Sequence, residues 1–219
     1  MRRVIYCLLV AAVLWFVMFS PWTAPLLNFW GAMTFSAIVL INLGLKAKLC
    51  DITWSDLHPR HWHSFFVRLF GKKGETLCLG IGLAFFLWLV FFIGDKASQW
   101  LFDFARPQVD TIYAMKDGTP SWLIALLLLL IIGPAEEIFW RGYIQRTLSA
   151  RFSPNTGFLL ATAAYTLVHL PSGNFMLIMA AMLCGICWGG LYRLRPQWFP
   201  AIVISHALWD AAAFVWFPF

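Results

Sequence analysis

Long apolar runs separated by short polar connections make up most of this chain. A helix needs about 20 mainly apolar residues to cross the hydrocarbon core of a bilayer. The pattern predicts an all-α, polytopic transmembrane helix bundle of about seven spans (six to eight), with residues 1–219 forming a single integral membrane domain. The expected spans are 4–19, 25–45, 77–94, 121–148, 155–170, 175–192 and 198–216.

Composition supports a membrane protein: 61% of the residues are hydrophobic and only 12% are charged. The net charge of +6 does not indicate nucleic-acid binding, because the basic residues are spread over the connections between apolar runs. Cytoplasmic connections are rich in Lys and Arg, so this distribution predicts a cytoplasmic amino terminus. The short chain with minimal loops favours a prokaryotic inner or plasma membrane. Residues assigned to the cytoplasmic side are Arg2, Arg3, Lys46, Lys48, Arg60, Arg68, Lys72, Lys73, Arg146, Arg151, Arg193 and Arg195.

Some suggestive features have simpler explanations. Residues 62–70 are expected to form a basic amphipathic helix on the membrane surface. The nearby His58, His61 and His63 flank a proline in a loop and do not indicate a metal site. The pair Cys184 and Cys187 lies mid-helix among small residues, which is typical of close helix packing rather than redox chemistry.

Ionisable side chains inside three apolar stretches are the feature that points to function. Such groups cost roughly 2.5–3.5 kcal/mol each on insertion scales, so they are rare unless they serve a purpose. Here each stretch contains a pair of such groups four residues apart, and residues i and i+4 share a helix face. The motifs are Glu136-Glu137-x-x-x-Arg141, Tyr165-x-x-x-His169 and His206-x-x-x-Asp210.

The motifs are expected at similar depth in the membrane. With a rise of about 1.5 Å per residue, Glu136 lies roughly 18 Å from the cytoplasmic end of its helix. The same calculation puts His169, His206 and Asp210 at roughly 21, 12 and 18 Å from that side. All four would therefore lie near the middle of the bilayer, where they can line one cavity.

Spacing within the motifs suggests different roles for their residues. Glu137 can pair with Arg141, which leaves Glu136 as the free carboxylate, and Asp210 can orient His206. Gly133-Pro134 is expected to break or kink the helix just before the glutamates.

The order of these motifs resembles the CPBP family, the CAAX prenyl proteases and bacteriocin-processing (Abi) enzymes, which are glutamic intramembrane proteases. The resemblance covers about residues 122–219, and the stretch Pro134-Ala-Glu-Glu-Ile-Phe-Trp-Arg-Gly-Tyr carries most of it. Residues 121–219 are the expected catalytic core. Two positions depart from the family pattern: Tyr165 replaces the usual phenylalanine, and Asp210 stands where asparagine is also common.

The resemblance implies a mechanism and assigns roles. Glu136 would act as general base on a water that attacks the scissile peptide carbonyl, and His169 would help hold that water and shuttle its proton. His206, oriented by Asp210, would stabilise the oxyanion, while Glu137, Arg141 and Tyr165 would support the site. Substrates would be membrane-associated proteins or peptides, and no cofactor is required.

Three alternatives remain open at this point. Glu136, His169 and His206 can also be read as a zinc site around a water, although the family resemblance points to a metal-free site. The same cavity could bind a peptide without cutting it, as an immunity factor would. Buried ionisable groups could also carry protons or ions in a small transporter, although no inverted repeat is visible.

Overall fold

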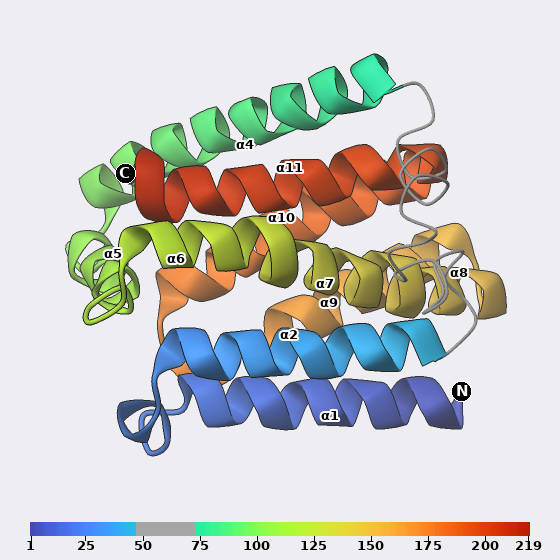
Figure 1. Cartoon of the computed structure of the whole chain (residues 1–219), viewed down its shortest axis with the longest axis horizontal. Helices are drawn as coiled ribbons and strands as arrows, with labels where there is room; N and C mark the ends of the chain where they lie inside the picture. The colour runs from blue at the N-terminus through green and yellow to red at the C-terminus, as the bar shows by residue number, and fades with distance from the viewer. Residues whose placement is uncertain (47–72) are drawn as a thin grey trace.

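The computed structural model describes residues 1–46 and 73–219, and every element within these ranges is a helix (Figure 1). An all-α helix bundle is thus confirmed for the part of the chain described. The expected surface helix at 62–70 and the three histidines near it lie outside the described residues.

The chain begins with an antiparallel helical hairpin. Helix α1 spans Arg2–Phe19 and helix α2 spans Phe29–Lys46, with a 3-10 turn at Ala24–Leu26 between them. The two helices lie side by side along one edge of the bundle (Figure 1). One face of α1 carries Trp15, which is fully buried and reaches toward the centre of the molecule.

A long central helix, Ser121–Arg151, carries the first motif. It consists of α6 (Ser121–Leu127), α7 (Gly133–Glu137) and α8 (Arg146–Arg151), joined by π-helical turns at Leu128–Ile132 and Ile138–Gln145. The helix does not break at Gly133-Pro134; its winding changes instead. Proline removes one backbone donor, and wider π-helical turns accommodate such interruptions, often at functional sites.

Two further helices pack behind the central one. Helix α9 (Pro154–Leu167) is shorter than expected, because Pro171 and the left-handed Gly173 (φ 61°) force a turn after it. A 3-10 segment, Leu170–Ser172, leads into helix α10 (Phe175–Leu194), whose first turn is capped by the side chain of Asn174. The second motif therefore straddles the end of α9, with Tyr165 on the helix and His169 in the turn.

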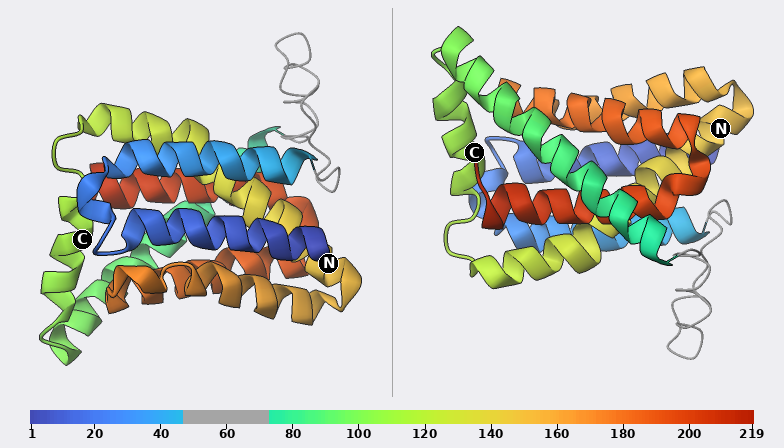
Figure 2. Two further views of the ribbon diagram at one scale, coloured as in Figure 1. Left: turned by 90° about the horizontal axis from the view of Figure 1, so that it is seen from below. Right: turned by 90° about the horizontal axis from the view of Figure 1, so that it is seen from above.

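The remaining helices close the bundle. Helix α4 (Lys73–Leu101) crosses helix α11 (Phe199–Ala211), which continues as a π-helical turn, Ala212–Trp216. A Cβ atom at Gly80 would lie 2.7 Å from Ile204 Cγ2, so glycine permits this close crossing. The short helix α5 (Ala105–Ala114) runs across one end of the bundle (Figure 2).

Five helices among the described residues are long and apolar enough to cross a membrane. They are Arg2–Phe19, Gly74–Leu101, Ser121–Arg151, Phe175–Leu194 and Pro196–Trp216. The apolar helix Phe29–Leu45 is slightly shorter, and α9 covers only part of the thickness with its 14 residues. The two chain ends lie at opposite ends of the bundle, as an odd number of crossings requires (Figures 1 and 2).

Candidate active site

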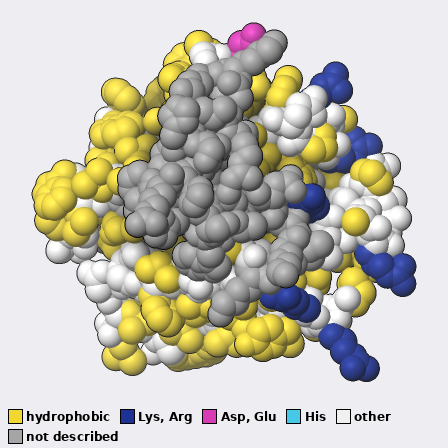
Figure 3. All heavy atoms as spheres, turned by 45° about the vertical axis from the view of Figure 1, so that its right-hand side comes forward, with side chains coloured by type: hydrophobic (Ala, Val, Ile, Leu, Met, Phe, Trp, Pro, Cys, Tyr) yellow, Lys and Arg dark blue, Asp and Glu magenta, His cyan; other side chains and the backbone are white. Residues whose placement is uncertain are grey.

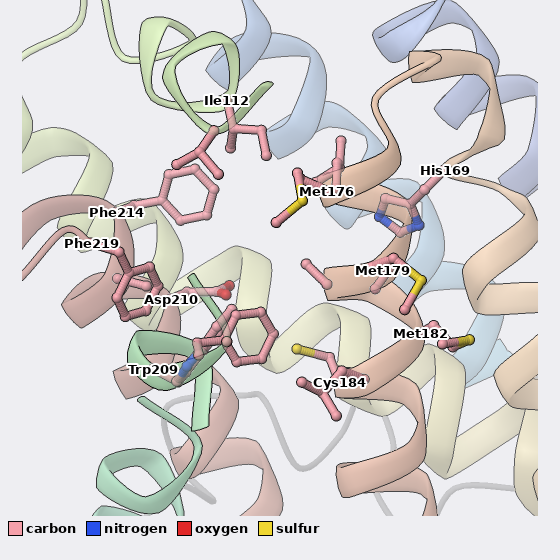
Figure 4. Close-up of a pocket in the computed structure, with 18 of the residues that line it drawn as sticks. Ile112, His169, Met176, Met179, Met182, Cys184, Trp209, Asp210, Phe214 and Phe219 are labelled. Atoms are coloured by element: carbon pink, nitrogen blue, oxygen red, sulfur yellow. The ribbon is translucent and has the colours of Figure 1, made fainter. Parts of the chain in front are cut away.

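A cavity of about 430 Å³ lies inside the bundle, and the predicted site residues reach it from three different helical segments. Glu136 comes from α7, His169 from the turn after α9, and His206 and Asp210 from α11. All four residues are buried. Figure 4 shows Asp210 on one wall, next to Trp209, and His169 on the facing wall. Cavities of this size suit small-molecule or peptide side-chain ligands.

Close approach of the helices brings these residues together. A Cβ atom at Gly133 would lie 2.9 Å from Ala207 Cα, so the absence of a side chain lets α7 rest directly on α11. Ala207 follows His206, and Gly133 stands one turn before Glu136. The glycine thus sets the distance between the glutamates and the histidine of α11.

Glu136 keeps one carboxylate oxygen for chemistry. The Tyr165 hydroxyl donates a hydrogen bond to Glu136 Oε2 at 3.1 Å. That hydroxyl is the one by which the second motif departs from the family pattern. The bond fixes the carboxylate against α9. It does not involve the other oxygen, Oε1, and Glu136 lines the cavity.

Glu137 joins two of the motifs. Its Oε1 accepts from Arg141 Nη1 at 2.8 Å and from His206 Nδ1 at 2.6 Å. The pair with Arg141 follows from the i,i+4 spacing, whereas the contact with His206 spans 69 residues of sequence. Glu137 therefore holds the imidazole of His206, in addition to its partnership with Arg141.

Asp210 lies on the other side of that imidazole. Its Oδ2 is 3.4 Å from His206 Nε2, longer than the contact on the Glu137 side. His206 thus stands between two carboxylates, with Nδ1 held by Glu137 and Nε2 on the side of Asp210. When both ring nitrogens are protonated, both can donate hydrogen bonds.

His169 uses both of its ring nitrogens in the structure. Its Nδ1 lies 2.8 Å from the Tyr165 carbonyl oxygen, which can only accept, so Nδ1 carries the proton. Its Nε2 accepts from the indole nitrogen of Trp15 at 3.2 Å. For His169 to hold a water, its Nε2 would have to release the indole of Trp15 and bind the water instead.

Two tryptophans that lie outside the three motifs belong to the site. The ring of Trp188 stacks on His206 with centroids 3.9 Å apart, and its indole nitrogen donates to Ser205. Trp15 holds His169 from α1. Both are essentially inaccessible to solvent, whereas interfacial anchors face outward. Their spacing from the three motifs carries no signal, because they come from separate helices.

Arg141 is enclosed on all sides. Besides Glu137, its guanidinium contacts the Cys184 carbonyl oxygen at 3.4 Å and lies 4.8 Å from the ring centroid of Tyr165. It is 2% exposed, so its charge depends on these partners. The Cys184 contact also explains why α10 must approach the central helix closely, as the small residues there predict.

Most of the remaining cavity wall is apolar, with Asp95, Ser98 and Tyr113 as further polar residues. Met176, Met179 and Met182 of α10 face Phe214 and Phe219 across the cavity (Figure 4). Methionine adapts to ligands of irregular shape, so these walls suit an apolar group. The candidate catalytic groups lie where α7, α9 and α11 meet.

One end of the cavity is framed by α5 and the last residues described. Arg106 Nη1 donates to the backbone oxygen of Phe219 at 3.2 Å, and the Phe219 N–H donates to the Tyr113 hydroxyl at 3.0 Å. Burial raises the pKa of the Tyr113 phenol, which therefore remains protonated and donates to the Ala213 carbonyl. The hydrogen bond to Asp110 raises the pKa of the Arg106 guanidinium.

Among residues 1–46 and 73–219, no group of three or more His, Cys, Asp and Glu side chains is arranged to hold a metal ion. Both nitrogens of His169 and Nδ1 of His206 already have partners. The zinc alternative at Glu136, His169 and His206 stays a prediction, which metal analysis of the purified protein would test.

Comparison with known proteins agrees with the geometry. Residues 118–212 match the family model described as Rce1-like, type II CAAX prenyl endopeptidase. This range overlaps the expected catalytic core and includes all three motifs. Neither a curated protein nor a solved structure is significantly similar to the chain. Residues 118–212 are thus similar to Rce1-like type II CAAX prenyl endopeptidases, which agrees with the resemblance that the motifs indicate.

Proposed function

We propose that the protein is an intramembrane endopeptidase that uses Glu136 to activate a water against a peptide bond. One observation carries the proposal: groups from three separate motifs meet around one buried cavity, in a segment that matches a protease family. Buried ionisable groups are costly, so a shared cavity is a reason for retaining them.

In the proposed mechanism, Glu136 is the general base. Its Oε2 is held by Tyr165, and Oε1 takes the proton of a water that attacks the substrate carbonyl. The proton then passes to the leaving amine, which completes hydrolysis. Because the carboxylate is fixed on one side only, it can orient the water without losing its own position.

His206 stabilises the oxyanion that forms. Glu137 holds Nδ1, so the ring cannot rotate, and Nε2 is the nitrogen available to a substrate oxygen. Asp210 Oδ2 lies 3.4 Å from Nε2 and can help to orient the ring. The role first expected of Asp210 alone is thus proposed to be shared, with Glu137 as the closer partner.

His169 is proposed to hold the attacking water through Nε2 after the hydrogen bond from Trp15 is broken. The Nδ1 bond to the backbone carbonyl keeps the required tautomer in both situations. Trp15 holds the nitrogen that the water would use, so binding of the water requires release of Trp15.

Substrates are proposed to be membrane-associated proteins or peptides with an apolar segment next to the cut. The walls of methionine and phenylalanine would take that segment, and the polar corner would take the scissile bond. Peptide maturation, removal of a sorting tail and bacteriocin-type processing all fit this description, and the position of the cut distinguishes them.

The test compares protein termini in membranes from cells that carry wild type or Glu136→Gln. New termini that appear only with wild type support proteolysis and identify the cut. Identical sets of termini, with both proteins expressed at equal levels, would refute the proposal in favour of a peptide-binding protein.

A further inference from the structure

The cavity occupies only one half of the bundle along its length. It is lined by Phe19 at the end of α1, by the first turns of α2 and by the second half of α4. On α10 the lining runs from Phe175 to Trp188, and on α11 it begins at His206. The helices that line the cavity therefore contribute from the same end, the one covered by α5 (Figures 1 and 2).

Among the described residues, closely packed side chains fill the opposite half of the bundle, which is called the solid end below. After Glu137, toward the carboxyl end of the central helix, large side chains are almost completely buried. They include Phe139, Trp140, Tyr143 and Ile144. They pack against α1, α2 and α9 in the main hydrophobic core. A peptide cannot approach the site through this half without unpacking the core.

The two ends also differ in charge. The solid end carries Arg2 and Arg3 at the start of α1 and four more arginines at the ends of α8 and α10, namely Arg146, Arg151, Arg193 and Arg195. Figure 3 shows Lys and Arg side chains gathered on this side of the molecule.

The cavity end has no such excess. Its three basic residues, Lys96, Arg106 and Lys116, are outnumbered by four acidic residues, Asp95, Asp103, Asp110 and Asp117. Two of the basic residues are paired with acids, since Lys96 Nζ lies 3.1 Å from Asp95 and Arg106 contacts Asp110. Connections rich in Lys and Arg stay in the cytoplasm, so the solid end is the cytoplasmic one.

Taken together, the position of the cavity and the distribution of charge lead to one inference, which rests on the proposed peptidase function. We propose that the site opens away from the cytoplasm and takes apolar peptide segments that have already been translocated, such as the outer ends of transmembrane helices. A cytoplasmic protein tail would meet the solid, basic end and could not reach Glu136.

The direction of opening can be tested without any activity. Ser98→Cys places a thiol on the cavity wall, and Gln197→Cys places one at the opposite end; neither changes the charge. A membrane-impermeant maleimide is applied to intact cells and to inverted membrane vesicles, with wild type as the control for native cysteines. We expect Ser98→Cys to be labelled in cells and Gln197→Cys only in inverted vesicles. The reverse pattern would overturn the proposal.

The substrate class is tested by the position of the cuts. Protein termini that appear with wild type but not with Glu136→Gln should map to translocated portions of membrane or exported proteins. Cuts in cytoplasmic portions would overturn this inference while leaving the peptidase function intact. If no termini depend on Glu136, the peptidase function and the substrate class fail together, and the labelling pattern alone decides the direction of opening.

Discussion

Glu136 and Glu137 are neighbours in sequence, yet the structure predicts that they respond differently to the same change. Glu137 is completely buried and accepts hydrogen bonds from Arg141 and His206, whereas Glu136 accepts one bond, from Tyr165. The substitution of glutamine removes the charge and keeps the shape. Applied to each position in turn, it compares a structural carboxylate with a catalytic one.

The expected loss of stability follows from the contacts of Glu137. Removing one partner of a buried ion pair costs about 3–5 kcal/mol, because the other charge is left uncompensated. For a chain of this size about 1 kcal/mol shifts Tm by about 2–4 °C, so Glu137→Gln should lower Tm by about 6–20 °C. Glu136→Gln keeps an acceptor for the Tyr165 hydroxyl and should change Tm by less than about 4 °C.

Thermal unfolding of the purified proteins in one detergent measures this difference, with cleavage assayed on the same samples. We expect Glu137→Gln to lose both stability and activity, and Glu136→Gln to lose activity alone. Equal melting temperatures for Glu137→Gln and wild type would refute the assignment of Glu137 as the residue that holds His206 and Arg141.

Three further predictions concern packing, the histidine and metal. Gly133→Ala should destabilise the protein by about 1–3 kcal/mol because its Cβ meets Ala207; Gly82→Ala, which has open space, is the control in the same melting assay. Trp188→Leu removes the ring stacked on His206 and should lower kcat/KM by about 2- to 12-fold, with expression unchanged. Chelators should leave kcat of the purified protein unchanged; loss of activity that zinc restores would favour the metal alternative.

Local spacing predicts some of the contacts in this site, and only the fold reveals the others. The Glu137 to Arg141 pair is an i,i+4 contact, so helix geometry is sufficient to predict it. The bond between Glu137 and His206 depends on how α7 lies on α11, which no periodicity encodes. The same reason explains why Trp15 and Trp188 could not be assigned to the site from sequence.

Helix boundaries show a similar division. The apolar runs predict where the membrane helices lie, because hydrophobicity over about 20 residues is a strong signal. The end of α9 before His169 and the π-helical turns around Pro134 arise from local backbone constraints and from packing. These departures occur next to the candidate catalytic residues, where regular helices would place the side chains differently.

The most direct test of the central claim is the turnover of a substrate peptide by purified wild type and Glu136→Gln, with binding measured separately. The substrate peptide has the sequence around a cut that is found in membranes with wild type but not in membranes with Glu136→Gln. We predict that Glu136→Gln binds the peptide with an affinity within a few-fold of wild type but does not cleave it. Cleavage by Glu136→Gln at a rate comparable to wild type would contradict the account.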